Sequence, residues 1–410
     1  MKPNSIAKTP VSTLAILAGL SLNLPALSAE DWPHWLGPNK DNIVSAAPDF
    51  DPDLRNWKIA WQKDVGLGYS SITAKDGRGY TMGHDGQSKE TIVCFDLETG
   101  EKIWDYSYTG DLIPKMHVGG PNASVTIIGD RIYAVSKDGQ VVCLTAKTGK
   151  KLWGINLTEV LDMKVPNWGF GSSPVEYQED ILISAGKTIA LNKQTGKTHW
   201  ISNQERNAGY GSPVVFDYVG KPFIATMDQD GLSVLDASNG KEIARHDQKV
   251  KFGMNATTPV VLDEGRHIFY YTNTNSELLA FDGKSLESTW GDRKLQNDLT
   301  RALLINGQLF GVNGANKQRK SSLYSRDAAT GEENWSVPEF GFASLIGIEE
   351  TLVILTEDGE LVTAQANPTG YSEISRKKLL DAICWTNPTY ADGKLFVRNE
   401  RGVLICLEKA

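Results

Sequence analysis

A ten-residue phrase recurs along the chain, and its spacing limits the folds that the sequence can adopt. The phrase reads FDLETGEKIW at residues 95–104, LTAKTGKKLW at 144–153 and LNKQTGKTHW at 191–200. Four further copies follow, so that the seven copies end at Trp104, Trp153, Trp200, Ala244, Trp290, Trp335 and Ile374. Successive copies lie 39 to 49 residues apart. A period in the forties is typical of the blades of a β-propeller.

Each repeat predicts four short antiparallel strands. In the second repeat these are residues 123–130, 131–139, 140–149 and 150–157. Asp138-Gly139 and Thr148-Gly149 supply the left-handed backbone that tight hairpin turns require. The Trp that ends the phrase then lies on the fourth strand, where we expect its ring to pack into the seam between adjacent blades.

The two ends of the chain predict one more blade. Residues 402–410 look like a third strand that no fourth strand follows, and residues 56–66 look like a fourth strand that nothing precedes. Trp61 takes the Trp position, 43 residues before Trp104. We therefore expect an all-β fold over residues 56–410: an eight-bladed β-propeller of four-stranded antiparallel blades, closed by pairing of the N- and C-terminal strands. Such closure leaves no open sheet edge.

The first 29 residues have the pattern of a signal peptide. Lys2 and Lys8 precede an apolar run at 11–27, and the small residues of ALSA (26–29) permit cleavage. No second apolar stretch approaches 18 residues, so we expect no membrane span. The interpretation is an exported monomer, periplasmic or extracellular, with residues 30–55 as a leader that straps across the propeller through Trp32 and Trp35. The net charge of −8 argues against nucleic acid as a partner.

The phrase, with its Thr-Gly turn and terminal Trp, resembles the tryptophan-docking motif of quinoprotein dehydrogenases, which are eight-bladed propellers that use pyrroloquinoline quinone (PQQ). The same repeat is found in PQQ-like propellers without a known catalytic role, including the outer-membrane barrel assembly lipoprotein. The resemblance covers residues 56–410. The stretch DWPHWLGPNKDNIVS (31–45) looks like the leader of exported bacterial PQQ-like repeat proteins. The resemblance implies the fold, and for the dehydrogenases it implies PQQ with Ca²⁺.

The four cysteines are expected to be buried thiols. Cys94, Cys143 and Cys406 share one repeat position on the third strand, where other copies carry mostly small or apolar residues. Packed sheets lie about 10 Å apart, which is too far for a disulfide. Cys384 lies elsewhere, at the start of a first strand. The cysteines have no metal-ligand spacing, so we predict no metal site built on them.

A second repeat marks the loops that lead into each first strand and approach the central channel. One of its positions is polar in all eight copies: Ser71, Ser124, Ser173, Ser212, Thr258, Arg301, Ser344 and Asn387. Two residues earlier, the position is often aromatic, as in Tyr69, Tyr210, Phe342 and Trp385. Hydroxyls at loop-to-strand junctions commonly bond local backbone groups, which is one reading of the serines. The other reading is a ligand site.

The candidate ligand-binding residues are Arg301, Asn387, Trp385, Asn122, Ser124, Ser173, Ser212 and Thr258. Polar groups that converge beside an aromatic ring are the ordinary make-up of a small-ligand site. The loops 111–121 and 158–170, with Lys115, His117, Asn167 and Trp168, are expected to form one wall.

Two functions remain open. The first is a binding or scaffold module that offers the channel face to a protein or a small polar ligand, without a cofactor. The second is a PQQ-dependent oxidoreductase of the alcohol or sugar dehydrogenase type, with a reduced site. The adjacent-cysteine disulfide of the alcohol-oxidising family is missing here, and Asp298 is the sole acid that we can place at the channel as a general base.

Overall fold

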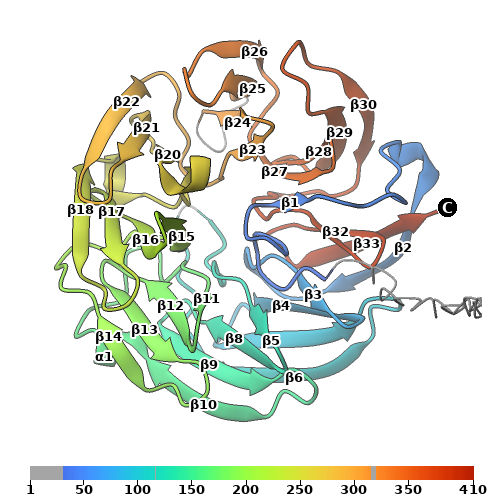
Figure 1. Cartoon of the computed structure of the whole chain (residues 1–410). Helices are drawn as coiled ribbons and strands as arrows, with labels where there is room; N and C mark the ends of the chain where they lie inside the picture. The colour runs from blue at the N-terminus through green and yellow to red at the C-terminus, as the bar shows by residue number, and fades with distance from the viewer. Residues whose placement is uncertain (1–30, 116, 315–319) are drawn as a thin grey trace, which may run out of the picture.

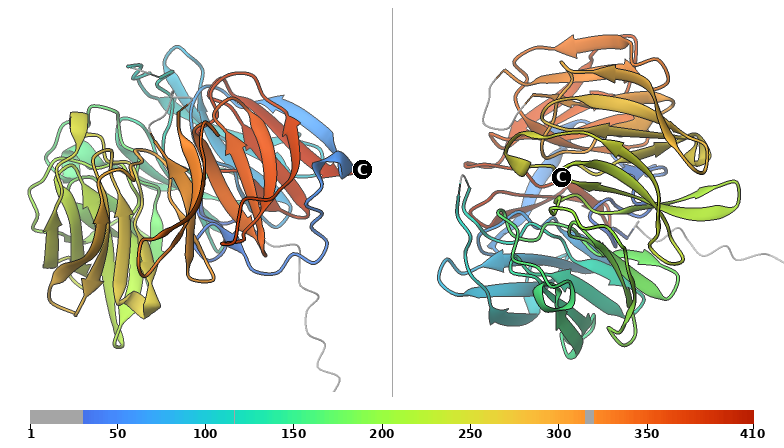
Figure 2. Two further views of the ribbon diagram at one scale, coloured as in Figure 1. Left: turned by 90° about the horizontal axis from the view of Figure 1, so that it is seen from above. Right: turned by 90° about the vertical axis from the view of Figure 1, so that its left-hand side faces the viewer.

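A ring of eight four-stranded antiparallel sheets makes up the part of the chain that the computed structural model describes, residues 31–115, 117–314 and 320–410 (Figure 1). The predicted eight-bladed propeller is thus confirmed. Figure 2 shows the ring from two further sides, with strands running roughly along its axis. The expected signal peptide, residues 1–29, lies outside the described residues.

The strands follow one another blade by blade from the inside of the ring to the outside. The first four blades are formed by β3 (Thr73–Lys75), β4 (Arg78–His84), β5 (Lys89–Asp96) and β6 (Lys102–Thr109); β7 (Thr126–Ile128), β8 (Arg131–Val135), β9 (Gln140–Thr145) and β10 (Lys151–Asn156); β11 (Val175–Tyr177), β12 (Asp180–Ser184), β13 (Thr188–Asn192) and β14 (Thr198–Ile201); and β15 (Val214–Tyr218), β16 (Lys221–Asp228), β17 (Gly231–Asp236) and β18 (Glu242–Asp247).

The next three blades continue in the same order. They are β19 (Val260–Leu262), β20 (His267–Tyr271), β21 (Ser276–Phe281) and β22 (Leu286–Asp292); β23 (Leu303–Ile305), β24 (Gln308–Asn313), β25 (Ser322–Asp327) and β26 (Glu333–Val337); and β27 (Ala343–Ile348), β28 (Thr351–Thr356), β29 (Glu360–Gln365) and β30 (Glu373–Lys378). The helical turns of the described chain are short: η1 (Leu54–Asn56), α1 (Leu157–Val160), η2 (Lys251–Gly253) and η3 (Asp263–Gly265).

The last blade joins both ends of the chain, as expected from the sequence. It contains β31 (Thr389–Ala391), β32 (Lys394–Arg398), β33 (Val403–Lys409) and, as its outer strand, β2 (Trp57–Asp64). The antiparallel register runs from Trp57 opposite Lys409 to Asp64 opposite Val403. Arg398, fully buried, then donates to the carbonyls of Ser70 and Met82 in the next blade, both at 2.9 Å.

The repeated phrase builds the seams between blades. The indole Nε1 of Trp104 donates to the carbonyl of Ala146 in the next blade at 3.0 Å, and its ring lies against Gly149 of that blade's Thr-Gly turn. A Cβ on Gly149 would lie 2.5 Å from the ring, so this position requires glycine. Trp61, Trp153 and Trp290 repeat both contacts with the blades that follow them.

Apolar side chains of neighbouring sheets interdigitate between the blades. One such core joins Tyr133 and Cys143 of one blade to Ile181 and Leu191 of the next. All four cysteines are free and buried, which confirms the expectation of buried thiols. Burial raises the pKa of the Cys94 and Cys143 thiols to about 11 and of the Cys384 and Cys406 thiols to about 12.

The leader lies across one end of the channel and contacts several blades. Trp32 exchanges two backbone hydrogen bonds with Ala74, both of 2.8 Å, and the Pro33 carbonyl accepts from Ile127 of the next blade at 2.8 Å. Further on, β1 (Ile43–Val44) pairs in parallel with β27. Figure 1 shows this segment, in blue, passing over the middle of the ring. The leader therefore ties together blades that are not neighbours.

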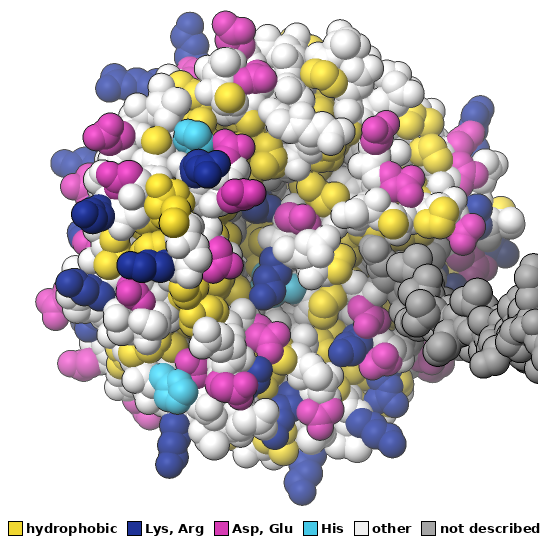
Figure 3. Space-filling view, in the orientation of Figure 1, with side chains coloured by type: hydrophobic (Ala, Val, Ile, Leu, Met, Phe, Trp, Pro, Cys, Tyr) yellow, Lys and Arg dark blue, Asp and Glu magenta, His cyan; other side chains and the backbone are white. Residues whose placement is uncertain are grey.

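Among the described residues, none of the helical segments has the length and apolar character needed to cross a membrane. Acidic and basic side chains are interspersed around the rim of the ring on the face shown in Figure 3.

Candidate functional site

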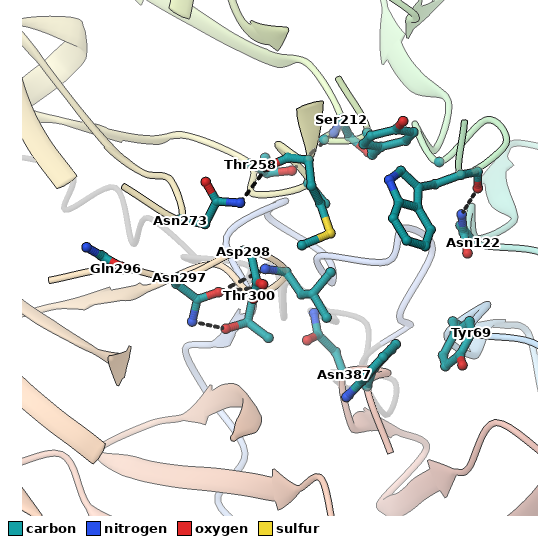
Figure 4. Close-up of a pocket in the computed structure, with 18 of the residues that line it drawn as sticks. Tyr69, Asn122, Ser212, Thr258, Asn273, Gln296, Asn297, Asp298, Thr300 and Asn387 are labelled. Carbon is teal, nitrogen blue, oxygen red and sulfur yellow. Dashed lines mark hydrogen bonds between the residues drawn. The ribbon is translucent and has the colours of Figure 1, made fainter. Parts of the chain in front are cut away.

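A cavity of about 1110 Å³ occupies the channel, and it is lined mainly by the loops that lead into the first strands. The leader contributes Trp35 to the lining, and Asn387 in the lining donates to the side-chain oxygen of Asn42 at 3.3 Å. The leader ribbon passes behind the labelled side chains in Figure 4. The leader thus lies at one end of the cavity.

A row of hydroxyls follows the curve of the ring along the cavity wall. The backbone N–H of Ser71 donates to the Ser124 hydroxyl at 2.9 Å, and the N–H of Ser124 donates to the Ser173 hydroxyl at 2.9 Å. The pattern continues through Ser212 (3.0 Å) to Thr258 (3.1 Å). We call Ser71, Ser124, Ser173, Ser212 and Thr258 the hydroxyl row. Each link joins one blade to the next, so the row has a structural role, and all five residues also line the cavity.

Aromatic rings form the wall on one side of the cavity. Tyr69 and Trp385 stack at a centroid distance of 5.2 Å, and His117 lies edge-on to Tyr69 at 5.6 Å. His117 also contacts Trp168, whose ring lies under the Nζ of Lys115 at 5.8 Å. We call Tyr69, His117, Trp168 and Trp385 the aromatic wall.

Two carboxylates hold the aromatic wall in place. Trp385 Nε1 donates to Oε1 of Glu357 at 2.9 Å, and the Tyr69 hydroxyl donates to Oε2 of Glu400 at 2.6 Å. Burial and the neighbouring Glu400 raise the pKa of Tyr69 well above its usual value, so the phenol keeps its proton. The rings are therefore fixed before any ligand arrives.

Asn122 links the two loops that carry His117 and Trp168 of the aromatic wall. Its Nδ2 donates to the carbonyl of Trp168 at 3.0 Å, and its Oδ1 accepts from Nζ of Lys137 at 3.0 Å. Lys137 is 1% exposed, and burial lowers the pKa of its ammonium group to about 7. Its Nζ also donates to the carbonyl of Gly120 at 2.9 Å. His117 and Trp168 come from the loops expected to form one wall, whereas Asn167 is not among the described lining residues.

The opposite side of the cavity comes from the β18–β19 and β22–β23 connections and from the β20–β21 turn. Asn297 bonds the Val312 carbonyl through Nδ2 at 2.9 Å and accepts from the Leu299 backbone at 3.0 Å, so its side chain shapes the loop. The Nδ2 of Asn273 donates to the Lys251 carbonyl at 3.0 Å, and the Nε2 of Gln296 donates to the Arg293 carbonyl at 2.6 Å. Figure 4 shows Asn273, Gln296 and Asn297 across the cavity from Tyr69.

Three cations line the mouth on this side. Lys251, Arg293 and Lys294 are exposed, and none of them forms an ion pair with any residue that the structure describes. We call these three residues the basic rim. Beside them lies Phe252, which is 84% exposed and has a left-handed backbone (φ 60°) that a bulky residue seldom adopts.

Most of the residues that the sequence singled out come together here. Seven of the eight candidate ligand-binding residues line the cavity, as does Asp298, which is 4% exposed. Arg301 lies apart from the described lining. Its Nε donates to the Pro259 carbonyl at 3.1 Å and one terminal nitrogen donates to the Asp41 carbonyl of the leader at 2.9 Å. Burial lowers the pKa of Arg301 to about 10, which leaves the guanidinium charged at neutral pH.

Sequence reasoning missed Trp35 as a lining residue and missed the basic rim altogether. Lys251 and Arg293 lie four or five positions upstream of the repeat windows that start at Asn255 and Asp298. These positions belong to no repeat, and their connections are no longer than several others, so the basic side chains themselves were the one signal for the rim.

The fold, the docking motif and the channel site define a β-propeller of the PQQ-like repeat class. A family model described as outer membrane protein assembly factor BamB matches residues 58–337, and the chain belongs to this family. No curated protein matches the sequence.

Solved structures share the fold at low identity. BamB from Moraxella catarrhalis is 15% identical with a TM-score of 0.61, covering 86% of this chain and 97% of its own. A quinohemoprotein alcohol dehydrogenase from Comamonas testosteroni is 13% identical with a TM-score of 0.69, covering 93% of this chain and 81% of its own. A europium-containing methanol dehydrogenase is 11% identical with a TM-score of 0.68, covering 90% and 89%. At these identities the likeness establishes the fold alone.

The cavity does not fit the PQQ and Ca²⁺ that a dehydrogenase of this fold would hold. Ca²⁺ prefers several oxygen ligands with carboxylates among them. Asp298 is the single carboxylate among the described lining residues, and the described chain holds no group of three or more metal-ligating His, Cys, Asp or Glu side chains. Arg301 donates to two backbone carbonyls rather than toward the cavity, where it would pair with the carboxylates of PQQ. Trp385 stacks on Tyr69, so this face of the indole is not open to a quinone ring. We therefore derive no chemical step through PQQ.

Proposed function

We propose that this protein is an exported binding module that holds a small polar ligand in the channel cavity and does not transform it. The observation that carries the proposal is the cavity itself, which joins a fixed aromatic wall to a row of polar groups. Its volume of about 1110 Å³ suits a small molecule, since ligand sites are concave, aromatic-lined and largely pre-formed.

The candidate residues take distinct roles under this proposal. Trp385 and Asn122 position the aromatic wall, and Ser124, Ser173, Ser212 and Thr258 offer hydroxyls to the ligand. Asn387 connects the cavity to the leader through Asn42. Arg301 acts as a positioning residue, because its bond to the Asp41 carbonyl holds the leader at the end of the cavity. Asp298 has no role in this proposal beyond the lining.

The test is a thermal-shift and calorimetric screen of the purified chain against polar metabolites, with PQQ plus Ca²⁺ included. Ala256 lines the cavity, so Ala256→Phe fills it. The matched control, Ala329→Phe, makes the same change on the exposed turn between β25 and β26. We expect the cavity variant to lose binding and the control to keep it. Binding of PQQ with dye reduction by alcohols or sugars, or binding that survives Ala256→Phe, would refute the proposal.

A protein partner at the same face is the second candidate, and Phe252 favours it. A bulky side chain held in a left-handed conformation and 84% exposed is strained without an evident packing gain. Exposed aromatic residues frequently anchor protein interfaces. Pull-down from the exported fraction with the wild type and with Phe252→Ser tests this candidate. A partner retained equally by both proteins would contradict it.

A further inference from the structure

We infer that the ligand of the channel cavity is an acidic sugar: a pyranose ring that carries a carboxylate. The inference rests on the proposed function and names the ligand class for that site. Three features of the described lining carry it: the hydroxyl row, the aromatic wall and the basic rim.

The hydroxyl row is chemically suited to a ligand with hydroxyls of its own. A serine or threonine hydroxyl has one proton to donate and two lone pairs to accept with. In Ser124, Ser173, Ser212 and Thr258 one lone pair accepts a backbone N–H of the preceding blade. Each of these hydroxyls keeps a donor and a second acceptor site. A row of groups that both donate and accept matches successive sugar hydroxyls, which do the same.

The aromatic wall argues for a saturated ring rather than a flat aromatic one. Tyr69 and Trp385 stack on each other with their planes 23° apart, so they leave no slot in which a planar ligand is sandwiched between two rings. Their remaining surface, together with Trp168, presents apolar area on which the C–H face of a pyranose packs. Burial of that area favours binding without specifying charge.

The basic rim supplies the preference for a carboxylate. The protein has a net charge of −8, yet the three exposed lining residues with formal charge on this side are Lys251, Arg293 and Lys294. No described carboxylate pairs with them. On the opposite side Glu357 and Glu400 hold Trp385 and Tyr69, and the two cations found there, Lys115 over the Trp168 ring and the buried Lys137, are not among the described lining residues.

This polarity orients the ligand. The carboxylate faces Lys251 and Arg293, where an arginine fork pairs with both oxygens, and the ring faces the aromatic wall. Figure 4 shows the two sides facing each other across the cavity, with Asn273 and Gln296 on one side and Tyr69 on the other.

The experiment compares D-glucuronate with D-glucose by titration calorimetry on the full mature chain, because the two sugars differ at one carbon. We expect glucuronate to bind more tightly, and added salt to reduce the difference. The double variant Lys251→Gln/Arg293→Gln is expected to weaken glucuronate binding about tenfold and leave glucose binding unchanged, as the loss of two exposed cations implies. Both side chains are exposed and unpaired in the described structure, so the variant is expected to fold normally.

The matched control is Lys241→Gln/Lys284→Gln, which removes the same charge from exposed turns outside the cavity lining. Glucuronate binding that is no tighter than glucose binding, or that the rim variant weakens no more than the control does, would overturn the inference. Glucose binding that is lost in Ala256→Phe would still support a binding module. Absence of binding by both sugars would also overturn it, and the metabolite screen then judges the proposed function separately.

Discussion

Glycine at the Thr-Gly turn is required by the docked tryptophan, and two glycines of one blade separate this effect from backbone strain. Gly129 and Gly149 both have left-handed backbones, with φ of +60° and +67°. A Cβ on Gly129 meets nothing within 4 Å, so Gly129→Ala costs only the backbone strain, about 1 kcal/mol. Gly149→Ala has the same strain, but its Cβ would lie 2.5 Å from Cε3 of Trp104.

The magnitude of the second effect follows from that distance. Ordinary contacts begin near 3.4 Å, so the Trp104 ring must move by about 1 Å, which overpacks the seam. The movement also weakens the 3.0 Å hydrogen bond from Trp104 to the Ala146 carbonyl. Together these add about 2 kcal/mol. We therefore expect Gly149→Ala to reduce the free energy of unfolding by about 3 kcal/mol and Gly129→Ala by about 1 kcal/mol.

Urea denaturation followed by far-ultraviolet circular dichroism measures both values, provided that the denaturant slope is the same in all three proteins. Equal losses for the two variants would refute the argument, because they would show that the docked Trp104 indole tolerates a Cβ at residue 149.

Three other predictions concern buried side chains. Ser173→Ala removes the acceptor of the Ser124 N–H in a buried seam, so it is expected to cost about 1–2 kcal/mol in denaturation; a loss within error would show that the hydroxyl row does not hold the blades. Burial raises the pKa of Glu90 from 4.5 to about 7, so between these pH values the folded protein keeps a proton that the unfolded chain releases. The free energy of unfolding should therefore fall as the pH rises from 4.5 to 7, by up to about 1.4 kcal/mol per pH unit. Glu90→Gln should remove this slope, which denaturation at several pH values measures. An aromatic disulfide reagent should titrate the four buried thiols only after unfolding, and prompt reaction of the native protein would contradict their burial.

The fold could be predicted from the sequence because its signals are periodic. The spacing of the phrase gave the blades, and the position of Trp61 relative to Trp104 predicted that β2 would complete the sheet of β33. Each repeat is a local unit, so one copy informs the reading of the others. Copies without Trp, such as the one at Ala244, still form blades, because their apolar strands pack between the neighbouring sheets.

The site could be predicted only in part. The hydroxyl row was visible as a column of serines, but the partner of each hydroxyl is the backbone of another blade, which the sequence does not reveal. Arg301 broke that column and was expected to meet a ligand. A long side chain can follow many directions, and here it reaches the Asp41 carbonyl of the leader, a contact between residues distant in the sequence. The basic rim lies in loops without a repeat, where periodicity gives no information.

The blade shared by the two ends has a consequence for the order of folding. Hairpins such as β8–β9 join residues close in sequence, whereas β2 pairs Trp57 with Lys409. The entropy lost in closing a loop grows with its length, and pairings between distant residues form slowly. We therefore expect the other blades to assemble first and the β2–β33 pairing to complete the ring last.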